Sequence, residues 1–263
     1  MRGINLKYAN INAKLKGMAV KRLNEDDIFN LIKQIDLKSA VDVLKTKVND
    51  LKDLDENADR TQIEQELEKI TYNDIAKIRR LLNSTEKEFF DLFVSKYNIK
   101  SNEYKKCVEQ IYEESKKFGK ELKGMIGEKI DLLNIIYIFR LKKYYHMNEE
   151  EIKNYLIQVR YNLKKETIHN LMKTNTFEEM IEILQSTIYR KIVQNITEEE
   201  IEKSINKYLY TKYKQIFAKS KYNICSVIAY MYLEEYQQTN IINILGGINY
   251  NLPKEEIQNK IIM

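Results

Sequence analysis

The sequence predicts an all-α protein built from repeated helical modules. The chain of 263 residues contains only 7 glycines, 1 proline and no tryptophan, so residues that break helices are scarce. Charged residues make up 32% of the chain and are concentrated in Glu and Lys, which suit exposed helix faces. No convincing alternation of apolar and polar residues, which is typical of a strand, is present. A chain of this length can bury a sizeable core in one large domain or two smaller ones.

A pattern that appears three times predicts the modular organisation. Each copy has an apolar residue, a cap-like residue, an acidic cluster, an Ile five positions after the first residue and an Asn two positions later. The copies begin at Leu23, Met147 and Leu252. An Asn-Ile pair lies upstream of the second and third copies, at Asn134 and Asn240, and Asn10-Ile11 holds a comparable place before the first. Repeated units of this kind favour a scaffold over a chemical site.

The N-terminal part is expected to contain helices over residues 4–17, where Gly17 ends the first, and over residues 37–54. Between them Asn24 caps a short helix whose first turn is acidic, as the helix dipole favours. Residues 55–71 are very polar and form either a linker or the start of a solvated helix.

Residues 72–128 are expected to form two or three long amphipathic helices, and an antiparallel helical hairpin is the simplest arrangement of them. Thr85 and Glu88 fit a capping box that opens one of these helices. Gly124 and Gly127 would allow a break before the next module. We therefore divide the chain into an N-terminal module, residues 1–128, and C-terminal modules, residues 129–263, in one continuous body.

The C-terminal part begins with a segment, residues 129–145, that is apolar nearly all round and is predicted to be a buried helix. Residues 220–245 predict one long helix ended by Gly246-Gly247, and Pro253 then opens the last helix. Three more helix starts are marked by capping pairs, namely Asn148 with Glu151, Thr176 with Glu179 and Thr197 with Glu200.

Charge and cysteine content bound the class of protein. The net charge is only +5 and its signs are interleaved, whereas a nucleic-acid binder would more often show a basic stripe. Cys107 and Cys225 are far apart, so a reducing compartment is expected. The N-terminus lacks the apolar core of a signal peptide, and no uncharged apolar run reaches the roughly 18 residues that a spanning helix needs.

Motifs for catalysis and cofactor binding are absent from the sequence. It has no glycine-rich phosphate loop, and its two histidines, His146 and His169, do not have the spacing of a zinc site. Acidic triplets such as Glu149-Glu150-Glu151 directly follow cap residues, where the helix dipole accounts for them. We therefore predict no catalytic, cofactor-binding or metal-binding residue.

Several polar residues in apolar helices are structural or interface candidates instead. Arg140 interrupts the helix over residues 129–145, and a buried Arg needs a partner. Asp131 is too distant along a straight helix to be that partner, whereas Glu234 and Glu235 of the long C-terminal helix are candidates.

Asn134 and Asn240 occupy equivalent repeat positions among Ile residues. Buried amides at these positions would fix the register between modules. The alternative is that one or both of them face solvent.

The segment from Asp131 to Tyr145 resembles the D-x-x-N-hydrophobic…R-x-K helix of the C/d subunit family of V/A-type ATPases. The segments 228–236 and 240–257 are similar to the C-terminal signature of that family, and residues 8–16 resemble its opening helix. Two departures affect the details of partner contacts. Members of that family usually carry three comparable D-x-x-N modules, whereas residues 55–128 contain no clear copy, so the chain is shorter and its first module is reduced. The C-terminal module lacks the usual acids, with Gln237 before Asn240 and Gly246 after it.

The resemblance implies a funnel-shaped helical body at the cytoplasmic face of the membrane, seated on the ion-translocating ring of a rotary ATPase. The central axle would dock into the funnel, and the body itself would be non-catalytic. One alternative is a helical adaptor that shares the fold without joining such a complex. Another is a small helical nucleic-acid or nucleotide-binding protein, which the interleaved charges disfavour.

Overall fold

The computed structural model describes residues 2–220 and 223–263, with the side chains of all of these except residues 2–6 and 101–102. Every regular element in these ranges is a helix, and none is a strand, which confirms the all-α prediction. The chain divides into two compact units. Unit 1 combines Met1–Leu82 with Tyr210–Met263, and unit 2 is the continuous segment Asn83–Leu209.

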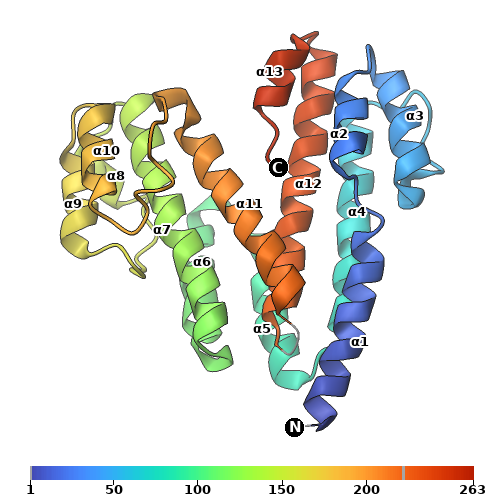
Figure 1. The fold of residues 1–263 in the computed structure, drawn as a ribbon, viewed down its shortest axis with the longest axis horizontal. Coiled ribbons are helices and arrows are strands. Elements are labelled where there is room, and N and C mark those ends of the chain that lie inside the picture. The colour runs from blue at the N-terminus through green and yellow to red at the C-terminus, as the bar shows by residue number, and fades with distance from the viewer. Residues whose placement is uncertain (1, 221–222) are drawn as a thin grey trace. The chain divides into compact units, whose positions relative to one another are not determined.

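Unit 1 is centred on the long C-terminal helix. Its elements are α1 (Arg2–Ala19), α2 (Glu25–Ile32), α3 (Leu37–Lys47), the 3-10 helix η1 (Asn49–Leu51), α4 (Arg60–Arg79), the end of α11 (Ile201–Lys219), α12 (Cys225–Asn249) and α13 (Lys254–Asn259). Helix α12 packs against α1, α2, α3, α4 and α13 (Figure 1). Apolar residues from several of these helices, such as Leu31, Leu44, Ile63 and Ile244, form one buried cluster. Segments from both ends of the chain therefore share one core.

Unit 2 is centred on a second long helix. Its elements are α5 (Ser84–Ser95), α6 (Ser101–Ser115), the 3-10 helix η2 (Lys116–Phe118), α7 (Lys120–Lys143), α8 (Glu149–Lys153), α9 (Lys165–Lys173), α10 (Phe177–Gln185), the 3-10 helix η3 (Glu198–Glu200) and the first part of α11. Helix α7 packs against α6 and α8, and α9 packs against α8 and α10 (Figure 1). Phe90, Phe93 and Leu132 are fully buried.

The observed division differs from the expected one at residues 128/129. Those two residues are neighbours inside α7, whereas the chain passes from one unit to the other between Leu82 and Asn83 and again between Leu209 and Tyr210, within α11. The reason is that α12 packs on the helices of the N-terminal segment, so the first and last parts of the chain form one unit.

Most of the helix starts that the capping residues predict are confirmed. Capping boxes join Asn24 to Asp27, Asn148 to Glu151 and Thr197 to Glu200. The hydroxyl of Thr176 accepts the N–H of Glu179, but the carboxylate of Glu179 accepts the N–H of Asn175 instead of that of Thr176. The expected box of Thr85 and Glu88 is wrong, because Asn83 and Glu86 form the box that opens α5.

Several expected boundaries shift. The helix expected over 37–54 ends at Lys47, where Val48 takes an extended conformation before η1. The polar segment 55–71 is a linker up to Asp59, which caps α4, and is helical from Arg60. Pro253 is the N-cap of α13 and precedes its first residue. The residues 221–222 of the helix expected over 220–245 lie outside the described ranges.

The glycines expected to end or break helices lie inside them. Gly17 is within α1, Gly124 and Gly127 are within α7, and Gly246-Gly247 is within α12. A Cβ on Gly247 would lie 2.5 Å from the side chain of Ile257, and one on Gly127 would lie 2.5 Å from that of Tyr161. Close packing by a following segment therefore explains these two glycines, in place of a helix end.

Candidate functional site

The candidate site consists of the polar side chains that the two long buried helices carry into the interior of each unit. Helix α7 contains Asp131 and Asn134, and helix α12 contains Glu234 and Asn240, all of them buried. Buried polar groups of this kind require hydrogen-bond partners, and their partners show what the groups hold in place.

Asn134 fixes the segment that follows α8 to the middle of α7. Its amide Nδ2 donates to the carbonyl of Ile157 over 3.0 Å, and its Oδ1 accepts the N–H of Ile157 over 3.0 Å. The side chain is fully buried, at 0% exposure. The Asn134 amide therefore provides hydrogen-bond partners for both the N–H and the carbonyl of Ile157, which lies outside any helix.

Asn240 makes the same pair of bonds in unit 1. Its Nδ2 donates to the carbonyl of Ile262, and its Oδ1 accepts the N–H of Ile262, both over 2.9 Å. Asn10, which holds a comparable place in the first copy, is exposed. The second and third copies therefore share an arrangement that the first copy does not adopt through Asn10.

Asp131 binds a second stretch of the same segment. Its carboxylate accepts backbone N–H groups from residues 161, 162 and 163 over 3.2, 2.6 and 3.1 Å, and the hydroxyl of Tyr189 over 2.8 Å. Its exposure is 0%. Three of these donors attach the loop between α8 and α9 to α7, and the fourth, Tyr189, attaches the segment after α10.

The same surroundings shift two pKa values. Burial raises the pKa of Asp131, and the hydrogen bonds from Asn162, Tyr189 and the other two N–H groups oppose it without cancelling it. Burial also raises the pKa of the Tyr189 hydroxyl, and the nearby charge of Asp131 raises it further. The Tyr189 hydroxyl therefore stays protonated and acts as the donor of the hydrogen bond to Asp131.

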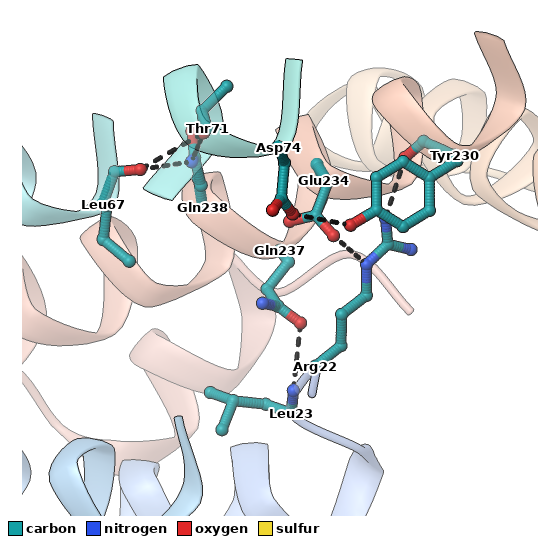
Figure 2. Close-up of polar contacts among 9 residues, drawn as sticks. All are labelled: Arg22, Leu23, Leu67, Thr71, Asp74, Tyr230, Glu234, Gln237 and Gln238. Atoms are coloured by element: carbon teal, nitrogen blue, oxygen red, sulfur yellow. Dashed lines mark hydrogen bonds and ion pairs between the residues drawn. The ribbon is translucent and has the colours of Figure 1, made fainter. Parts of the chain in front are cut away.

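Gln237 occupies the position in α12 that Asp131 occupies in α7, three residues before the repeated Asn. Its Oε1 accepts the N–H of Leu23 over 3.0 Å (Figure 2). Where the second copy has the carboxylate of Asp131, the third therefore has a single amide oxygen, and this oxygen holds the connection between α1 and α2. This contact lies within unit 1.

A buried ion pair lies beside the contact between Gln237 and Leu23. Arg22 donates through Nε to Glu234 and through its terminal nitrogen to the carbonyl of Tyr230 over 2.8 Å (Figure 2). The guanidinium carbon lies 4.2 Å from the centre of the Tyr230 ring. The side chains of Arg22 and Glu234 are only 13% and 11% exposed. This pair joins the α1–α2 connection to the middle of α12.

The network continues to α4. The hydroxyl of Tyr230 donates to Asp74 over 2.9 Å, and Asp74 pairs with Lys77 over 3.0 Å. Further along α12, Gln238 donates to the carbonyl of Leu67 over 3.1 Å and to the hydroxyl of Thr71 (Figure 2). Side chains of α12 therefore bond to the α1–α2 connection and to α4 through directional contacts.

The expectation for Arg140 is wrong. Its side chain is 52% exposed, and its Nε donates to Glu202 of α11 over 2.6 Å, so neither Glu234 nor Glu235 is its partner. Glu234 pairs with Arg22, and Glu235 is half-buried in unit 1. The prediction of burial rested on the apolar neighbours of Arg140 in the sequence, but this residue lies on the solvent-facing edge of α7.

Four important residues were not singled out from the sequence: Arg22, Asp74, Tyr189 and Tyr230. Only Arg22 carries a usable signal, because it directly precedes the first copy of the repeated pattern. Within the described residues, no group of three or more His, Cys, Asp or Glu side chains is placed to hold a metal ion. Among the same residues, no helix combines the length and the apolar character needed to cross a membrane.

Comparisons with known proteins identify the family. The model of the ATP synthase (C/AC39) subunit family matches residues 11–101 and 99–260. The C subunit of an A-type ATP synthase from Methanocaldococcus jannaschii is 24% identical over 155 residues, covering 55% of this chain and 39% of the relative. The match therefore spans about two fifths of the length of that relative. Because the family model matches most of the sequence, the chain belongs to the ATP synthase (C/AC39) subunit family, the C/d subunit family of V-type and A-type ATPases.

Proposed function

We propose that this protein is the central-stalk coupling subunit of a V/A-type rotary ATPase. In this role it seats on the membrane ring that moves ions, receives the axle, and transmits rotation between them. It is non-catalytic and binds at the cytoplasmic face of the membrane as part of the complex. Membership of the ATP synthase (C/AC39) subunit family is the observation that carries the proposal.

The buried contacts support this function because a coupling part must transmit torque without yielding. The segments after α8 and α13 are each held by one buried amide, which donates one hydrogen bond to the backbone and accepts another from it. The α1–α2 connection is held through Leu23 and the Arg22–Glu234 pair. Closely packed interiors transmit strain because they are hard to compress, and directional bonds to irregular segments extend that stiffness beyond the helices.

Capture of partners tests the proposal. Tagged protein is incubated with detergent-solubilised membranes of its own host, and the bound subunits are identified by mass. The expected eluate contains both ring and axle subunits. A tagged helical protein of similar size and charge serves as the control. A clean monomer, recovered while ring and axle subunits are present in the input, would contradict the coupling role and favour the adaptor.

The non-catalytic assignment has a separate test. Purified protein is mixed with ATP and magnesium, and the release of phosphate is followed. We expect no release above that of a heat-denatured sample. Release that persists through further purification and follows the protein across column fractions would contradict a purely mechanical role.

A further inference from the structure

A small basic cavity in unit 2 is not explained by the contacts described above. It lies between the end of α8, the loop that follows and one face of α9, and its volume is about 170 Å³. Its lining includes four side chains that carry or can carry positive charge: Lys153, Arg160, Lys165 and His169. No Asp or Glu contributes to the lining.

The walls of this basic cavity are fixed in place. Ile157 is held by both hydrogen bonds of Asn134, and the N–H of Gln158 donates to Glu109 over 2.7 Å. The residues that follow the lining residue Arg160, residues 161–163, lie outside the lining and donate their N–H groups to Asp131. Because the loop is already ordered, a ligand would not have to order it on binding, which lowers the free-energy cost of association.

Part of the positive charge at the cavity is not compensated. Lys153 pairs with Glu149 and Glu150 over 3.0 and 2.7 Å, and Nδ1 of His169 lies 2.7 Å from Glu149. Arg160 and Lys165 are exposed, and neither has an ion-pair partner among the described residues. The rim therefore presents two cations to any anionic group that enters.

The floor of the cavity is apolar. Leu156 and Val159 from the loop and Met172 from α9 are 4%, 6% and 4% exposed. Sites for whole cofactors or drug-sized molecules usually occupy about 300–1,000 Å³. At about 170 Å³ this cavity is smaller, and its size suits one or two protein side chains.

We propose that this cavity is a docking site for a partner protein, and that it accepts an acidic side chain from a segment in which Glu or Asp adjoins an aliphatic residue. The carboxylate would lie between Arg160 and Lys165, and the aliphatic neighbour would contact the floor. Two neighbouring positive charges favour a partner of negative charge and speed its association. The proposal does not depend on the rotary-ATPase role, since any protein with such a segment would fit.

The test uses the full-length chain and a defined probe. A capped pentapeptide that alternates leucine and glutamate is titrated into isotope-labelled protein, and backbone amide shifts are followed by nuclear magnetic resonance. The same peptide with glutamine in place of glutamate is the matched probe. We expect the glutamate peptide to shift amides within residues 153–172, and the glutamine peptide to leave them unchanged.

Charge-removing variants locate the contact. R160Q/K165Q should weaken binding of the glutamate peptide by about tenfold, as expected for the loss of two exposed ion pairs. R190Q/K191Q removes the same two residue types elsewhere in unit 2, where both are exposed, and should leave the dissociation constant unchanged. Melting curves check that each variant folds. In wild-type protein, raising the salt from about 0.05 M to about 0.3 M should weaken binding, because salt screens exposed charges.

Three results would overturn the proposal. Equal binding of the two peptides would show that charge does not select the ligand. Equal weakening by R160Q/K165Q and R190Q/K191Q would show a diffuse attraction to a basic surface. Displacement of the peptide by inorganic phosphate, with the same amide shifts at lower concentration, would make the cavity a site for a small anion. Ring and axle subunits are absent from this assay, so its outcome is separate from that of the capture experiment.

Discussion

Asn134 and Asn240 make the same two hydrogen bonds in two different units of the molecule. Each is buried in a long helix, and each donates to and accepts from the backbone of a single isoleucine, Ile157 or Ile262. The second and third copies of the repeat therefore share a tertiary contact as well as a sequence pattern. The contact joins a long helix to the segment that follows the next short helix.

Replacing Asn134 with alanine should strongly destabilise the protein. The change leaves the buried N–H and C=O of Ile157 without partners, and each such group costs about 1–3 kcal/mol. We expect a loss of about 2–4 kcal/mol in the free energy of unfolding, measured with urea. N10A is the matched control, because Asn10 is exposed, and it should stay within about 0.5 kcal/mol of wild type. Similar losses for both variants would refute the assigned role of Asn134.

Two arginines, one buried and one exposed, should differ sharply in their contribution to stability. R22A leaves Glu234 buried without its cation, which typically costs about 3–5 kcal/mol. R140A removes an ion pair whose arginine is 52% exposed, and such pairs contribute about 0–1 kcal/mol. Thermal melting of the two variants side by side gives the comparison. A melting temperature for R140A as low as that for R22A would mean that Arg140 is buried after all.

Asp27 should make stability depend on pH in the acid range. Burial raises the pKa of its carboxyl, but hydrogen bonds from Lys47 and from the N–H of Asn24, with the charge of Lys47, outweigh burial and hold the pKa below its usual value. The stabilisation is therefore present above the unfolded pKa of about 3.9 and is lost as the pH falls through the lower folded pKa.

The variant D27N keeps an oxygen that can accept the N–H of Asn24 but loses the attraction to Lys47, which lies 2.8 Å away. It should be less stable than wild type by about 1 kcal/mol or less at pH 7. The difference should vanish in urea titrations below the folded pKa. A difference that is constant from pH 7 to about pH 2 would exclude the ion pair as its cause.

Two glycines in helices should respond to alanine in opposite directions. A Cβ at position 247 would meet Ile257 at 2.5 Å, so G247A should cost about 1–3 kcal/mol through overpacking. A Cβ at position 17 meets nothing within 4 Å, so G17A should stabilise by up to about 1 kcal/mol through helix propensity. Both changes are measured by urea unfolding. Stabilisation by G247A would show that Ile257 does not pack closely on α12.

Features that depend on neighbouring residues were predictable from the sequence. The capping boxes at Asn24, Asn148 and Thr197 follow from residues three positions apart, and the helical class follows from composition. The glycine pair in α12 was misinterpreted because a helix end and a close contact both favour glycine. Only the packing of Ile257, ten positions after Gly247, distinguishes these two explanations.

The partners of buried polar groups were not predictable from the sequence. Arg22 follows α1 and Glu234 lies in α12, far apart in the chain, and no periodic pattern specifies which helices meet. Arg140 has the same kind of apolar neighbours as a buried residue, yet it lies at the exposed edge of α7. The funnel shape and the contacts with ring and axle stay predictions.

The composition of unit 1 sets an order of events during synthesis. Domains usually fold as the chain emerges, with the N-terminal one first. Here α1 to α4 depend on α12 for their core, and the ribosome makes α12 after all of unit 2. Unit 2 can therefore fold before α12 has been made, while the apolar faces of α1 to α4 are still uncovered. We expect the nascent chain to depend on chaperones in this interval, and mutations in α12 to expose the beginning of the chain to proteases.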